Sequence, residues 1–363
     1  MTDSTPDSTP GAGPEAAVGV PASDETARVE AAALATTRES NPVVALLRSS
    51  AGLNAGLVVA LLIVCIVGAA TAGDRFTSTD NALTIVRYAT TIGVVSIGMT
   101  FVIIGGGIDL SVGAIVALSS VWCTTVATQQ SAEDNHWIVI VFVALAVGAG
   151  CGLVNGLLIS YGGVVPFIAT LAMLASARGL AEIISDKKTQ IVHVPEFTDF
   201  FDREILGISF SIYLFALVAI VGWVLLNRTT FGRRTIAVGG NPEAARLAGI
   251  NVKRHTVLLY VLLGICCGIA ALILVARTST GSSTHGQLYE LEAIAAAVIG
   301  GALLSGGRGS IVGAVFGVLI FATLTNVFVL NNRTQSEQQL VKGAIIVAAV
   351  LLQQRLASRN RST

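Results

Sequence analysis

The chain has 363 residues, of which 53% are hydrophobic and 12% are charged, and its mean hydropathy is +0.77. Soluble globular proteins carry about a quarter charged residues, so this composition excludes an ordinary cytosolic enzyme. The 22 basic and 22 acidic residues cancel, which leaves no overall positive field that would attract a nucleic-acid partner. Composition therefore predicts a membrane protein.

The first 48 residues differ from the rest of the chain. They contain five of the eight prolines, seven acids and three arginines, and no apolar run that could form a core. This composition is typical of a disordered segment, and it lacks the basic start and apolar stretch of a secretory signal. We expect a disordered cytoplasmic N-terminal tail over 1–48, a transmembrane domain over 49–355 and a cytoplasmic C-terminal tail over 356–363.

Charge-poor stretches of about 20 residues, the length of a bilayer crossing, recur from residue 49 onward. They predict an all-α polytopic membrane protein with about ten transmembrane helices. The expected spans are 53–72, 88–104, 110–128, 137–159, 164–184, 205–227, 256–276, 292–305, 309–330 and 340–355. The eighth and tenth are short for a full crossing, and eight spans would result if both were re-entrant.

Basic residues in the connections between spans predict the orientation. The stretch 228–254 has six Lys or Arg residues against one acid, whereas 178–204 has four against six acids. We therefore expect 228–254 and both termini on the cytoplasmic side of the membrane, and 178–204 on the outside.

Motifs of catalysis are missing from the sequence. It contains no G-x-x-x-x-G-K-[ST] phosphate loop, no H-E-x-x-H helix and no G-x-S-x-G elbow. The five cysteines lie in apolar runs without metal-ligand spacing, and the four histidines are expected to be ordinary surface residues. We expect no catalytic residue, no metal site and no resident cofactor. Asp109, Arg178, Glu182 and Lys342 lie near span ends, which disfavours an ion-coupled secondary carrier but leaves it open.

The stretch 228–254 is the most informative part of the sequence. Asn241 can cap a helix, Pro242 suits its first position, and Glu243 complements its positive end. Gly249 can end the helix, so the pattern predicts about two turns that would fit a groove on another protein. A basic loop that only fixes topology is the alternative. The residues assigned to this docking surface are Arg233, Arg234, Asn241, Pro242, Glu243, Arg246, Leu247 and Gly249.

Three sequence blocks follow one another between about residues 80 and 355. The first, 97–113, contains Gly-Met-Thr and Gly-Ile-Asp-Leu-Ser-Val-Gly; the second is 231–250, and the third joins 289–301 to 306–313. A shorter match covers 165–171 and 177–179. In this order the blocks resemble the permease subunits of bacterial ABC importers for ribose, xylose, arabinose, galactosides and related simple sugars. One mild departure is Glu292, where that family often has Asp.

The resemblance implies a type II-like importer in which two permease subunits of about ten helices each surround one path. ATP-binding subunits would dock on the coupling helix in 228–254, and an extracytoplasmic sugar-binding protein would deliver the substrate. The expected function is passage of a pentose or hexose across the bacterial cytoplasmic membrane, by a subunit that is not itself an enzyme and leaves ATP to its partner. The second permease subunit would be another copy or a paralogue. The alternatives are an ATP-independent carrier or facilitator, and an ABC permease for a nucleoside or related furanoside.

Under this resemblance, seven residues are assigned to the translocation path. They are Gly105, Gly106, Gly107, Asp109, Ser111, Asn155 and Thr170. The carboxylate of Asp109 could accept hydrogen bonds from sugar hydroxyls, but its position also suits a cap of the third span, and spacing alone favours the cap. The basic residues of 228–254 could pair with acids of the ATPase or contact anionic membrane lipid. Because the spans hold few aromatic side chains, we expect tight sugar selectivity to reside in the binding protein.

Overall fold

The computed structural model describes residues 50–359, so the tail expected over 1–48 lies outside the described residues. The long helices are α3 (Ser50–Ala72), α5 (Thr79–Ile104), α8 (Ile138–Ser160), α9 (Pro166–Ser185), α11 (Phe210–Arg228), α14 (Val252–Thr278), α16 (Ile311–Leu330) and α17 (Gln335–Arg359). The shorter helices are α4 (Asp74–Thr77), α6 (Val112–Cys123), α7 (Val126–Asp134), α10 (Pro195–Asp202), α12 (Thr230–Gly240), α13 (Pro242–Leu247) and α15 (Tyr289–Ile299). Strand β1 (Gln190–Ile191) pairs with β4 (Thr280–Gly281), and β2 (Glu204–Ile205) pairs with β3 (Ile208–Ser209), both antiparallel.

Each of the ten expected spans corresponds to a helix or to a bent pair of helices. Within residues 50–359, seven helices are long and apolar enough to cross a membrane, namely α3, α5, α8, α9, α11, α14 and α16. Helices α6 and α7 share the third expected span and meet at a bend of 54°. Helix α15, in the eighth expected span, has 11 residues and is too short for a full crossing. The tenth expected span lies within α17, so the prediction of an all-α polytopic membrane protein is confirmed.

Helix α5 lies at the centre of the bundle. In its most apolar stretch 89% of the residues are buried, against 17% in α3 at the edge. Helices α11, α14, α15 and α16 all pack on α5. Side chains such as Met99 and Phe101 of α5 therefore belong to one core with Tyr260 and Leu263 of α14. A helix enclosed in this way is apolar on all sides, which explains the uncharged run before Asp109.

Helices α8 and α14 approach each other unusually closely. A Cβ atom on Gly148 would overlap the carbonyl oxygen of Gly264, and one on Gly152 would overlap the carbonyl oxygen of Tyr260. Glycine is therefore required at both positions of α8. Such small-residue contacts are the usual way for helices to associate where lipid provides no hydrophobic drive.

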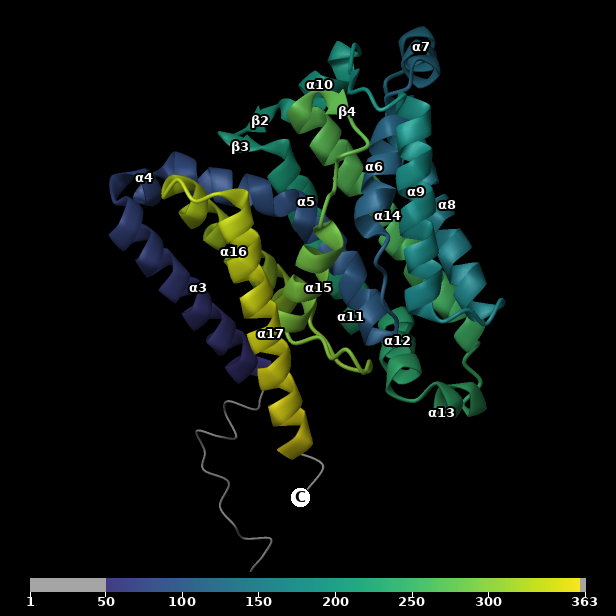
Figure 1. Cartoon of the computed structure of the whole chain (residues 1–363). Helices are drawn as coiled ribbons and strands as arrows, with labels where there is room; N and C mark the ends of the chain where they lie inside the picture. The colour runs from purple at the N-terminus through teal and green to yellow at the C-terminus, as the bar shows by residue number, and fades with distance from the viewer. Residues whose placement is uncertain (1–49, 360–363) are drawn as a thin grey trace, which may run out of the picture. The chain divides into compact units, whose positions relative to one another are not determined.

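The bundle has two distinct ends (Figure 1). Helices α12 and α13 lie at one end, and α4, α7, α10 and the short strands lie at the other. We call these the α13 end and the α10 end. The basic stretch 228–254 and the acidic connection that follows α9 thus lie at opposite ends, as the predicted orientation requires.

Candidate functional site

The helix predicted after Asn241 is present as α13. The side chain of Asn241 accepts a hydrogen bond from the backbone N–H of Ala244 at 3.0 Å, and Pro242 occupies the first turn. Gly249 follows the helix with a φ of 82°, a left-handed conformation that costs little for glycine. The predicted cap, first-turn proline and terminating glycine are therefore confirmed, and the helix has six residues.

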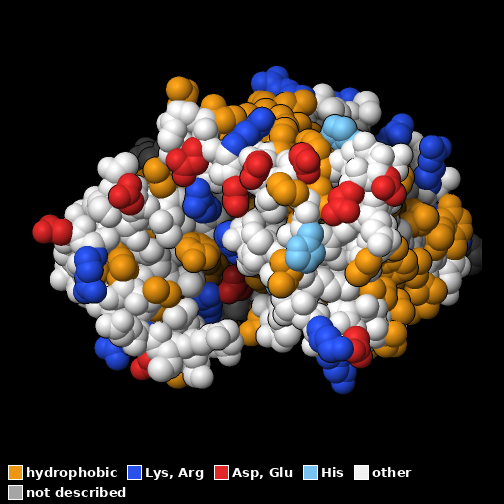
Figure 2. Space-filling view, turned by 90° about the horizontal axis from the view of Figure 1, so that it is seen from above, with side chains coloured by type: hydrophobic (Ala, Val, Ile, Leu, Met, Phe, Trp, Pro, Cys, Tyr) orange, Lys and Arg blue, Asp and Glu red, His pale blue; other side chains and the backbone are white. Residues whose placement is uncertain are grey.

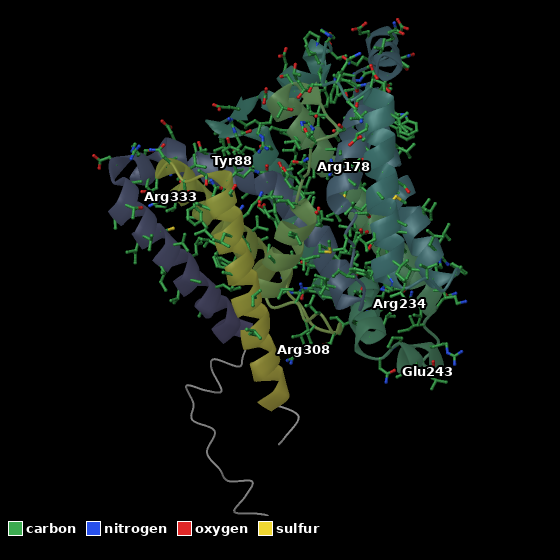
Figure 3. The ribbon with its side chains drawn as sticks, viewed as in Figure 1. Tyr88, Arg178, Arg234, Glu243, Arg308 and Arg333 are labelled. Atoms are coloured by element: carbon green, nitrogen blue, oxygen red, sulfur yellow. The ribbon has the colours of Figure 1, made fainter. Side chains whose placement is uncertain are left out.

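Almost the whole of α13 is exposed. Only Ala245 is buried, whereas the apolar side chain of Leu247 is 79% exposed. Arg246 pairs with Glu243 at 2.5 Å across one turn, and Arg233 and Arg234 on α12 are also exposed. Figure 3 shows that Arg234 and Glu243 lie together at the α13 end of the molecule. This end exposes the apolar side chains of Leu247 and Ile236 among charged groups, most of which are basic.

Helix α12, which precedes α13, was not expected from the sequence. The hydroxyl of Thr229 accepts hydrogen bonds from the backbone N–H groups of Phe231 and Gly232, and this Thr before a polar run was the available signal. Thr235 of α12 is hydrogen-bonded to His255 of α14 at 2.9 Å. His255 is 5% exposed, so the expectation that it is a surface residue is wrong.

Three segments distant in sequence meet at a junction built from glycine. We use the name glycine junction for Gly106 after α5, Gly239 at the end of α12, and Gly306 with Gly307 before α16. A Cβ atom on Gly239 would overlap the carbonyl oxygen of Ile104, and the N–H of Gly307 donates to that same oxygen at 2.8 Å. Gly106, Gly306 and Gly307 have φ between 77° and 83°. The backbone of the coupling segment thus contacts the loops that lead into α6 and α16 without intervening side chains.

A buried polar network lies beside this junction. The Asp109 carboxylate accepts hydrogen bonds from the N–H and hydroxyl of Ser111, at 2.7 and 2.5 Å. The Asn155 amide on α8 donates to Asp109 at 3.2 Å and to the Ser111 hydroxyl at 3.0 Å. All three residues are at most 1% exposed. Asp109 therefore closes the turn before α6 by accepting from one backbone amide, that of Ser111, whereas the N-cap residue of α6 is Ser111 itself.

Of the other residues assigned to the path, Thr170 is buried, Gly105 and Gly107 are half-buried, and Gly106 is exposed. Gly105 and Gly107 lie against Leu259 and Tyr260 of α14, and the Tyr260 hydroxyl donates to the carbonyl of Ile108 at 3.0 Å. Thr170 is fully buried and donates to the carbonyl of Pro166 within its own helix. The structure brings Asp109, Ser111 and Asn155 together and leaves Thr170 apart from them. Contact of these residues with a substrate stays a prediction.

A second polar cluster, which sequence reasoning missed, surrounds the first turn of α15. Arg178 of α9 donates to the carbonyl oxygens of Ser283 and His285, the latter at 2.9 Å. The His285 ring is hydrogen-bonded to Ser120 of α6 at 3.2 Å. Burial, together with the positive charges of Arg277 and Arg178, lowers the pKa of His285 to about 4. This histidine is thus a half-buried neutral group at physiological pH and not the surface residue that we expected.

The same cluster continues on the opposite side of α15. Lys342 of α17 pairs with Glu292 at 2.6 Å, with side chains only 14% and 28% exposed. Arg277 at the end of α14 lies 5.0 Å from the centre of the Tyr88 ring and interacts with the Tyr289 hydroxyl. We call these residues the α15 cluster. Its members are Tyr88, Arg178, Glu182, Arg277, His285, Tyr289, Glu290, Glu292 and Lys342, where Glu182 and Glu290 are included because both interact electrostatically with Arg178.

The chain was compared with known proteins. Residues 81–350 match the family described as branched-chain amino acid transport system / permease component. The ribose import permease of Bacillus subtilis is 41% identical over 82% of this chain and 90% of its own length. The L-arabinose ABC transporter permease of Azospirillum brasilense is 35% identical over 85% and 89%, and the D-allose permease of Escherichia coli is 34% identical over 77% and 85%. No solved structure gives a significant match. The chain therefore belongs to the family of ABC importer permeases in which these sugar permeases are found.

Proposed function

We propose that this chain is the membrane subunit of an importer that moves a pentose or hexose across the bacterial cytoplasmic membrane, driven by ATP that a separate subunit hydrolyses. The observation that carries the proposal is the exposed, capped helix α13, joined through the glycine junction to the loops before α6 and α16. The substrate class is supported by relatives named for ribose, arabinose and allose.

The ATPase subunit would dock at the α13 end. Leu247 would enter a groove on that subunit, because its apolar side chain is 79% exposed on a short capped helix, and an apolar helix face can dock into a groove. Arg233, Arg234 and Arg246 would pair with acids that surround the groove, or with anionic lipid where they lie beyond it. The chain itself would hold no nucleotide and no other cofactor.

A binding protein would deliver the sugar at the α10 end, which would face the outside. Both termini would be cytoplasmic, and a second permease subunit would complete the path. Movement of α13 would shift the glycine junction and so open or close the turn at Asp109, where Ser111 and Asn155 are buried with it. Loaded binding protein and ATP would then favour different conformations of the same subunit.

The direct test is reconstitution. The chain would be purified with the ATPase and binding protein encoded beside it and placed in liposomes with labelled D-ribose or L-arabinose. We expect uptake that requires ATP and the binding protein. Uptake without either one would identify a carrier, and uptake of a nucleoside but of neither sugar would favour the furanoside alternative.

The docking surface is tested by the double variant Glu243→Ala with Arg246→Ala. We expect it to abolish stimulation of the ATPase while leaving the fold intact, because both side chains are about two-thirds exposed. The matched control is Asp186→Asn with Lys188→Ala, which removes another exposed ion pair at the α10 end. Normal stimulation in the first variant would contradict docking at α13.

A further inference from the structure

The α15 cluster lies on the opposite half of the molecule from the proposed ATPase surface. Viewed from the α10 end, the molecule is hollowed near its centre, and acidic and basic side chains gather around the hollow (Figure 2). Figure 3 places Tyr88 and Arg178 toward this end, whereas Arg234, Glu243 and Arg308 lie toward the α13 end. Charged side chains inside a membrane protein are costly, so such a group indicates a function.

One member of the cluster has an unmet hydrogen bond. The Nη1 atom of Arg277 is buried and has no hydrogen-bond partner among the described residues. A buried hydrogen-bond donor without a partner destabilises a protein. The ring that covers this guanidinium belongs to Tyr88, which is 60% exposed. The arrangement leaves an arginine donor available to an incoming acceptor.

The charge balance of the cluster indicates the kind of ligand that it can bind. Arg178, Arg277 and Lys342 are balanced by Glu182, Glu290 and Glu292, so the cluster has no net charge for an ion to neutralise. Half-buried carboxylates accept from hydroxyl groups and guanidinium groups donate to them, and both kinds of bond are stronger than those between neutral groups. Tyr88 adds an exposed aromatic face that can cover an apolar ring surface. This is the chemistry of a neutral polyhydroxylated ring.

We propose that the α15 cluster is a sugar-contact site of the permease, in which Arg277 donates to one sugar hydroxyl, Glu292, one turn along α15 from Tyr289, accepts from another, and Tyr88 covers the ring. This inference rests on the proposed function. It also revises the expectation that selectivity resides in the binding protein alone, because discrimination at this site would depend on which hydroxyls the sugar carries. The competing explanation is a structural network that only holds α15 in place.

The two explanations predict different rates of uptake, by variants of the permease, for sugars that lack one hydroxyl group. Uptake of D-ribose and of each of its single-deoxy derivatives would be measured in the reconstituted complex with wild-type permease, with Arg277→Lys and with Tyr88→Leu. The binding protein is the same throughout, so its own preference cancels when wild type and variant are compared. Loss of one protein–hydroxyl contact should make Arg277→Lys at least fivefold less discriminating against one deoxy sugar. A network that only supports α15 would slow all the sugars by the same factor, and this result would overturn the inference.

Tyr88→Leu has a close control in Tyr161→Leu. Tyr161 is 57% exposed and also lies near a cation, Lys253, but at the α13 end. We expect Tyr88→Leu to lower D-ribose uptake at limiting sugar about fivefold and Tyr161→Leu to leave it unchanged. If Arg277→Lys fails to assemble with the ATPase, the comparison of Tyr88→Leu with Tyr161→Leu remains the test. Equal D-ribose uptake by the two tyrosine variants would overturn the inference. Absence of ATP-driven sugar uptake by the wild-type complex would instead refute the proposed function.

Discussion

The glycine junction and the α15 cluster differ in the groups that make their contacts: backbone atoms in the first and long charged side chains in the second. At the junction, three segments meet backbone to backbone, and a Cβ atom on Gly239 would occupy the position of a carbonyl oxygen. Around α15, long charged side chains from α9, α14 and α17 reach across the space between helices. A backbone contact moves as a rigid body, whereas long side chains adapt to what binds among them. The first arrangement suits transmission of movement and the second suits recognition.

The largest effect is expected from Gly239→Val, which would disrupt the backbone contacts of the glycine junction. The added side chain would overlap the Ile104 carbonyl, and backbone cannot yield as a flexible side chain can. We expect no assembled permease in detergent, as measured by size-exclusion chromatography with the ATPase. Gly240→Ala is the control, because open space surrounds its Cβ position. It should be neutral or stabilise the helix by up to about 1 kcal/mol, and equal damage from both variants would remove the special role of Gly239.

Next in size is the ion pair of the α15 cluster. Lys342→Ala leaves the Glu292 carboxylate half-buried without its partner, so we expect a loss of about 3 kcal/mol in the free energy of unfolding. Glu292→Gln combined with Lys342→Gln should recover most of this loss, since no uncompensated charge remains. Thermal unfolding of the purified protein measures both. Equal stability of Lys342→Ala and wild type would show that the pair is in fact solvated.

A smaller loss is expected from Asp109→Ala, beside the glycine junction. The change leaves the buried amide N–H of Ser111 without an acceptor, which we expect to lower the free energy of unfolding by about 2 kcal/mol. Ser111→Ala removes one hydroxyl and should cost about half as much. Thermal unfolding again gives the values. Unchanged stability in Asp109→Ala, together with altered sugar preference, would assign Asp109 to the path and not to the turn.

The smallest effect should come from Arg87→Gln. Arg87 pairs with Glu204 at 3.3 Å, but both side chains are about half exposed, so the pair contributes at most about 1 kcal/mol. Stability and sugar preference should both match wild type, in contrast to Arg277 in the α15 cluster. A clear change in sugar preference would extend the contact surface toward β2 and weaken the contrast drawn here.

Local features were predictable from the sequence, and long-range ones were not. The cap, proline and glycine of α13 depend on neighbours within eight residues, so their pattern was sufficient. The ten span segments follow from hydropathy in the same way. Hydropathy does not show that α6 and α7 bend by 54° or that α15 stops after 11 residues, because packing on other helices decides both.

The two polar sites show the same limit. Asp109 and Ser111 are neighbours in sequence, and their turn was foreseen, but the contribution of Asn155 required the fold. In the α15 cluster, Arg178 contacts carbonyl groups more than a hundred residues away. No periodicity connects such residues. Arg178 and Glu292 did lie in the sequence blocks that carried the family resemblance, which was the available signal for the cluster.

Helix α14 connects the coupling segment to the α15 cluster without interruption. It starts at Val252, directly after the coupling segment, and Arg277 lies in its last turn, about 40 Å away at 1.5 Å per residue. The close glycine contacts with α8 hold α14 between Val257 and Gly268 and so resist bending of the helix there. A displacement at the proposed ATPase surface would therefore be carried along α14 to the α15 cluster.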